Sequence, residues 1–100
     1  MSTSTTTTTD CYSTPGEILS EEFLEPLNIS RYRLAKAINV SETAIGEIVN
    51  GKRRITTSMA YRLGKALGTT PDFWANLQSD YDLLTFDSSG LGDIRPLATA

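Results

Sequence analysis

The chain has 100 residues, a net charge of −3, one cysteine and no histidine, which fits one small domain with polar ends. A single cysteine without any histidine excludes an internal disulfide, a Cys/His zinc site, a Ser-His-Asp triad and a Cys-His dyad. Because no apolar run approaches the length of a membrane span and no signal-peptide pattern is present, we expect a cytoplasmic protein with no cofactor, no metal and no membrane contact.

The charges are unevenly distributed along the chain. Residues 30–70 carry eight Lys and Arg side chains against two glutamates. Residues 1–29 carry five acids and no base, and residues 71–100 carry five aspartates and one arginine. A cationic middle between acidic flanks indicates a polyanionic partner for the middle. On charge alone, a solvated helical surface explains the pattern equally well.

The first predicted helix follows a segment rich in serine and threonine. Residues 2–9 are of low complexity and have nothing to bury, so we expect residues 1–13 to be disordered. Pro15 suits the first helical position, and Pro26 ends the helix near Glu25. Between them, apolar residues repeat at helical spacing: Ile18, Leu19, Phe23 and Leu24.

Two short helices are predicted next, each with a serine cap. Ser30 caps a helix over 31–38, and Ser41 caps one over about 42–49 that ends at Asn50-Gly51. Because only two residues separate them, the helices should cross sharply, and Asn39 tolerates the left-handed conformation that such a turn often needs. Their predicted core residues are Leu34, Ala35, Ile38, Ala44, Ile45 and Ile48.

Two further helices complete the domain. Thr56 or Thr57 caps a helix that runs to Leu67, and Thr70-Pro71-Asp72 starts the last one. The first should bury Met59 or Ala60, Leu63, Ala66 and Leu67, and the apolar stripe of the second is Phe73, Trp74, Leu77, Tyr81 and Leu84. The fold prediction is therefore all-α, with five helices in a domain over 14–85 and a loose tail over 86–100.

The predicted helix over 42–49 has two distinct faces. At about 100° per residue, its non-core positions fall within an arc of about 140°: Glu42, Thr43, Gly46, Glu47 and Asn50. Two short helices joined by a tight turn, the second with a polar face at its N-terminal end, indicate a helix-turn-helix. The second helix of such a unit fits the major groove of DNA.

Cations border this polar face on both sides. Three follow the helix directly and two start the preceding helix: Lys52, Arg53, Arg54, Arg31 and Arg33. We expect them to contact the phosphates that flank the groove, together with Ser30 and the nearby helix amides. A plain helical bundle would explain the apolar periodicity equally well, but not this placement of the cations. The sequence therefore favours DNA binding.

Three stretches together resemble the HigA/VapI-type antitoxins, a branch of the Cro/C1-repressor (XRE) helix-turn-helix family. They are PGEILSEEFLEPLNIS (15–30), RLAKAINVSETAIGEIVNGKRRIT (33–56) and AYRLGKALGTTPDFWANLQSDYDL (60–83). The combination of PGEIL, EIVNGKRRIT and TPDFW at these spacings is specific. The resemblance implies a lambda-repressor-like fold and a homodimer on a palindromic, double-stranded DNA operator in its own operon. It also implies neutralisation of a HigB-type, ribosome-dependent mRNase toxin.

The resemblance also implies roles for individual residues. The base-reading places are occupied by Ser41, Glu42, Thr43 and Glu47. The places that contact the DNA backbone are occupied by Ser30, Arg31 and Lys52, and we expect Arg33, Asn50, Arg53 and Arg54 to join them.

The last helix is the predicted dimer surface. The two reading helices of a dimer lie about 34 Å apart, so the interface must be distant from residues 42–49. We expect Phe73 and Leu77 to face the core of the monomer. Some of Trp74, Tyr81 and Leu84 would then face the partner, although a role in the monomer core is equally open for Trp74.

Two other binding functions stay open. The chain could be a stand-alone XRE-family repressor without a toxin, or an interaction module that has lost DNA binding. A mobility shift with the DNA upstream of the gene would separate an operator-binding antitoxin or repressor from the interaction module, and the identity of the neighbouring gene would test the pairing with a toxin. An enzyme is disfavoured, because the carboxylates are spread over helix surfaces and form no acid–base constellation.

Overall fold

The computed structural model describes residues 13–98. Its elements are α1 (Pro15–Ile18), the π-helical segment η2 (Leu19–Leu24), α2 (Arg31–Ile38), α3 (Glu42–Val49), α4 (Thr57–Leu67), α5 (Pro71–Thr85) and the 3-10 turn η3 (Ser89–Leu91). These residues contain no strand, so the all-α, five-helix prediction is confirmed. The predicted disorder over 1–13 falls almost wholly outside the described residues.

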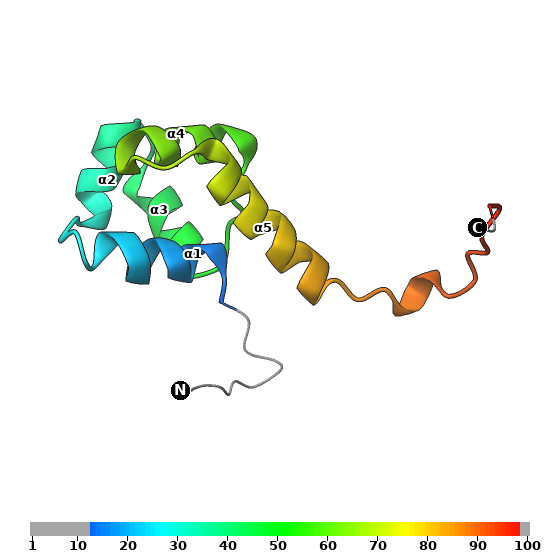
Figure 1. Cartoon of the computed structure of the whole chain (residues 1–100). Helices are drawn as coiled ribbons and strands as arrows, with labels where there is room; N and C mark the ends of the chain where they lie inside the picture. Colours follow the sequence, from blue (N-terminus) through cyan, green and yellow to red (C-terminus); the bar gives the residue numbers. More distant parts are fainter. Residues whose placement is uncertain (1–12, 99–100) are drawn as a thin grey trace, which may run out of the picture.

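The first four helices form the body of the molecule (Figure 1). In this view α3 lies between α1 below and α4 above, with α2 beside it. α5 packs against α4 and then leads away from the body, and the residues after it continue outward. None of the helices in the described part of the chain is long and apolar enough to cross a membrane.

Local capping explains why the helices begin where they do. The side chains of Ser30, Ser41, Thr56 and Thr70 each accept a backbone N–H in the first turn of the helix that follows. Asn39 has a φ of 61°, so the left-handed turn predicted between α2 and α3 is confirmed. Val40 N–H donates to the Ala35 carbonyl at 3.0 Å across this turn. Such caps satisfy backbone groups that the helix ends leave unpaired.

The core is built from side chains of η2 and of α2, α3, α4 and α5. The largest fully buried ones are Trp74, Leu19, Leu34, Ile45, Ile48 and Leu63. All six core residues predicted for α2 and α3 are buried. The prediction for Ala66 is wrong, since this residue is exposed. α4 turns Ala60, Leu63 and Gly64 inward instead, and a Cβ on Gly64 would lie 2.9 Å from the Thr69 carbonyl oxygen.

Close packing of α1 on α3 fixes the position of α3. A Cβ on Gly16 would lie 1.7 Å from the Ile48 carbonyl oxygen and 2.9 Å from the Cα of Val49. Only glycine permits α1 to approach the last turn of α3 this closely. The sequence analysis did not identify this role of Gly16.

Trp74 belongs to the core of the monomer, so its prediction as a dimer contact is wrong and the alternative core role is correct. Its side chain is fully buried, and its ring contacts those of Phe23 and Phe73 at centroid distances of 5.1 and 4.9 Å. The indole N–H donates to the Thr69 hydroxyl at 2.7 Å. Phe73, expected to face the core, stays 38% exposed at its rim.

Candidate nucleic-acid interface

The polar face of α3 forms the floor of a shallow depression. Six of the predicted DNA-contacting residues and Gly46 line it: Arg31, Glu42, Thr43, Glu47, Asn50 and Lys52. Glu42 and Thr43 are exposed, whereas Gly46 and Glu47 are half-buried. The structure therefore brings three of the predicted base readers together with three of the predicted backbone contacts.

Ser41 and Ser30 have defined roles as caps at the edges of this surface. The Ser41 hydroxyl accepts the Ala44 N–H at 3.0 Å, and the Ser30 hydroxyl accepts the Arg33 N–H at 3.0 Å. Both residues are exposed. Each hydroxyl retains a proton to donate to a phosphate or a base.

A tight turn places the three cations directly after α3. Gly51 has a φ of 77°, and the Lys52 N–H donates to the Glu47 carbonyl at 2.7 Å while the Gly51 N–H donates to that of Ile48 at 3.1 Å. This pair of bonds is a Schellman motif, which requires a left-handed residue at Gly51. The turn holds Lys52 beside the depression that α3 lines.

Arg53 pairs with a carboxylate of the reading face itself. Its Nη2 and Nε atoms both donate to Oε1 of Glu47, at 2.6 and 2.9 Å. The contact balances a negative charge that would otherwise repel phosphate. Oε2 of Glu47 is not part of this contact, so it can accept a hydrogen bond from DNA.

Arg54 pairs with Asp82 of α5, at 2.6 Å. The contact continues into the core, because Gln78 donates from Nε2 to Asp82 at 3.0 Å and accepts the Ile55 N–H on Oε1 at 2.8 Å. The hydrogen bonds from Gln78 and Arg54 hold the pKa of Asp82 below its ordinary value. Sequence analysis missed this link; the only available signal was a Gln78–Asp82 pair at helical spacing in an apolar stripe.

Arg31 crosses from α2 to the face of α3. Its Nη1 atom lies 3.4 Å from the position that a Cβ on Gly46 would occupy. Arg33, also predicted as a backbone contact, is exposed but does not line the depression. The two arginines at the start of α2 therefore occupy different surroundings.

A fold in which α2 and α3 cross at a tight turn, with a polar α3 bordered by cations, defines a helix-turn-helix protein. The chain matches the helix-turn-helix family HTH_3 over residues 21–74 and belongs to that family.

Several relatives are similar over most of the chain. The uncharacterized HTH-type transcriptional regulator YbaQ of Escherichia coli is 46% identical over 70 residues, which is 70% of this chain; the match covers only 62% of YbaQ. Virulence-associated protein I of Dichelobacter nodosus is 44% identical over 85% of this chain and 81% of its own length. These relatives are named as regulators or virulence-associated proteins, not as enzymes.

A solved structure of a similar protein includes DNA. The Pseudomonas aeruginosa antitoxin HigA, in a structure with the higBA promoter, is 42% identical to this chain. It superposes with a TM-score of 0.77, covering 86% of this chain and 98% of HigA. The comparison extends the likeness through all five helices, beyond the helix-turn-helix itself.

Proposed function

We propose that this protein is the DNA-binding antitoxin of a toxin–antitoxin module. It binds as a homodimer to a palindromic operator in its own operon and represses transcription, and it neutralises a HigB-type mRNase toxin. The observation that carries the proposal is the depression over α3, where Thr43, Glu42 and Glu47 meet the cations Arg31 and Lys52. The likeness to HigA with its promoter supports the same assignment.

In the proposed complex α3 lies in the major groove. Thr43 and Glu42 are exposed in the first turn, where side chains reach deepest between the bases, and Glu47 can accept from cytosine N4. The phosphates on either side are contacted by side chains and amides that give register without sequence information: Ser30, Arg33, Asn50, Lys52, Arg53 and Arg54. Ser41 contributes from the N-terminus of α3.

The homodimer is proposed to form through the distal part of α5. Leu84 is 59% exposed and Tyr81 is half-buried, and both lie on the helix that leads away from the body. An interface there is separate from α3, as two reading helices about 34 Å apart require.

A stand-alone repressor is the second candidate, favoured by the name of YbaQ as a transcriptional regulator. Two measurements in cells separate the candidates. A reporter behind the upstream DNA should be repressed by this protein in both cases. Expression of the neighbouring gene should arrest growth, and co-expression of this protein should restore it, only if the protein is an antitoxin. Repression without such rescue would support the stand-alone repressor. The absence of both repression and rescue would refute the proposal.

A further inference from the structure

α3 carries a glycine in the middle of its polar face. Gly46 has no positive φ and is not required by a turn, and glycine inside a helix costs about 1 kcal/mol relative to alanine. Among residues 13–98, and apart from the adjoining residues and the backbone of α3 itself, the only heavy atom within 4 Å of an added Cβ is Nη1 of Arg31, at 3.4 Å. The missing side chain therefore leaves a gap in the reading face, and an arginine from the neighbouring helix lies over it.

The guanidinium of Arg31 is available for a ligand. In residues 13–98 the ion pairs are Arg53 with Glu47 and Arg54 with Asp82, and Arg31 takes part in neither. Its side chain lines the same depression as Glu42, Thr43 and Glu47. Among residues 13–98, Arg31 is thus an arginine that lines this depression and forms no ion pair with a carboxylate.

We propose that Arg31 is a base-reading residue that recognises a guanine through the gap left by Gly46. A guanidinium offers two parallel donors, which fit O6 and N7 of guanine in the major groove, and this is the commonest specific contact between a side chain and a base. The inference rests on the proposed DNA binding and deepens it. It moves Arg31 from the backbone contacts, where the family resemblance puts it, to the residues that set sequence preference.

The lysine variant separates the two roles of Arg31. Arg31→Lys keeps the positive charge that a phosphate contact needs, but replaces the rigid pair of parallel donors that matches O6 and N7 of guanine with a single flexible ammonium group. Arg33→Ala is the matched control, because Arg33 starts the same helix but does not line the depression. Both positions are exposed on α2, so each variant should fold.

The test is a selection of bound sequences from a randomised operator. For wild type we expect a G·C pair at one symmetric position, preferred by about 5- to 150-fold. Arg31→Ala should lose that preference and Arg31→Lys should weaken it, while Arg31→Lys keeps its affinity for unrelated DNA. Arg33→Ala, which removes a proposed phosphate contact, should weaken binding to all sequences alike and keep every preference. An unchanged profile for Arg31→Ala would overturn the inference while leaving DNA binding intact. A wild-type protein without any sequence preference would overturn both.

A second variant tests the gap itself. Gly46→Leu fills the space over α3 with a good helix former, so the fold should persist, but it displaces the Arg31 side chain. We expect the same G·C preference to disappear in Gly46→Leu. Adding Arg31→Ala to this variant should cause no further change in the base preference at that position of the operator. Retention of the preference in Gly46→Leu would show that Arg31 does not read the base by this route.

Discussion

Arg53 and Arg54 each pair with a carboxylate within the monomer: Arg53 with Glu47 on the polar face of α3, and Arg54 with Asp82 on α5. The side chains of both arginines are about half exposed or more, and exposed ion pairs of this kind contribute little to stability. A phosphate can therefore replace or share the carboxylate at little cost. The pairs orient the two arginines, because Glu47 is fixed on α3 and Asp82 on α5.

Replacing Arg53 and Arg54 together by alanine should weaken binding to all DNA sequences to a similar extent. Each phosphate contact contributes about 0.9 to the slope of log affinity against log salt concentration, so the slope should flatten by up to about 2. Anisotropy titrations of operator and unrelated DNA at several salt concentrations measure both quantities. A loss confined to the operator, with the slope unchanged, would make these arginines base readers.

The hydrogen bonds to the Asp82 carboxylate should make the stability of the protein depend on pH. Its pKa is lowered from 3.8 in the folded protein by the hydrogen bonds from Gln78 and Arg54, so its contribution to stability is fully present above that value and is lost as the pH falls through the lower folded pKa. Thermal unfolding should therefore show a constant difference in stability between wild type and Asp82→Asn at neutral and mildly acidic pH. The difference should narrow below pH 3.8. A difference that grows on acidification would contradict the assigned contacts.

At the scale of the elements, much of the fold could be predicted because its signals are local. Serine and threonine caps, glycine stops and apolar spacing set the bounds of α2 and α3. Each of these signals involves only a few neighbouring residues. The buried role of Trp74 and the Gln78–Asp82 link could not be predicted, because both depend on which helices meet. Within the site, the face of α3 was predictable from its period, whereas the partners of Arg53 and Arg54 were not.

Gly16 and Gly46 should respond in opposite ways to substitution by alanine, because only Gly16 lies in the contact of α1 with α3. Gly16→Ala must push α1 away from the Ile48 backbone, and we expect a loss of about 1–3 kcal/mol or more in the free energy of unfolding. Gly46→Ala, the matched control, meets only the flexible end of Arg31 and should gain up to about 1 kcal/mol. Urea unfolding followed by circular dichroism measures both. Equal stability of Gly16→Ala and wild type would refute the close contact.

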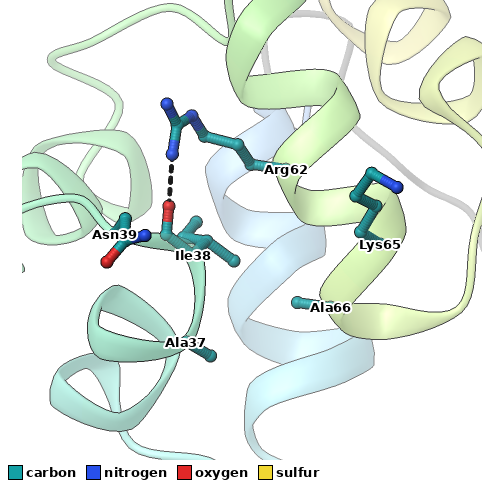
Figure 2. Close-up of a pocket in the computed structure, with 6 residues that line it drawn as sticks. All are labelled: Ala37, Ile38, Asn39, Arg62, Lys65 and Ala66. Carbon is teal, nitrogen blue, oxygen red and sulfur yellow. Dashed lines mark hydrogen bonds between the residues drawn. The ribbon is translucent and has the colours of Figure 1, made fainter.

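At the scale of the whole molecule, three of the exposed apolar residues lie close together at the end of one helix. Leu83, Leu84 and Phe86 are 76%, 59% and 65% exposed, at the end of α5 furthest from the body (Figure 1). By contrast, the hollow between α2 and α4 is lined by charged as well as apolar side chains: Ala37, Ala66, Arg62 and Lys65 (Figure 2). Arg62 donates to the Ile38 carbonyl there. The end of α5 therefore offers an exposed apolar surface for the proposed dimer contact.

Tyr81→Asp combined with Leu84→Asp should give a folded monomer with much weaker operator binding. Charges at these positions disfavour burial between two copies of α5, and a monomer engages only one half-site. Sedimentation measures the oligomeric state, and Leu84→Asp alone serves as a check, since Tyr81 is partly buried within the monomer. An intact dimer would move the interface to α1 or to residues 85–100.

The most direct test of DNA reading by α3 is the affinity of wild type and Thr43→Ala for the upstream operator and its single-base variants. Thr43 is exposed in the first turn of α3, so alanine should leave folding intact. We expect Thr43→Ala to change the preference at one or two base pairs by about 1–3 kcal/mol. Wild type should bind the operator at least about 10³-fold more tightly than unrelated DNA. Equal affinity of wild type for operator and unrelated DNA, or an unchanged preference in Thr43→Ala, would contradict the account.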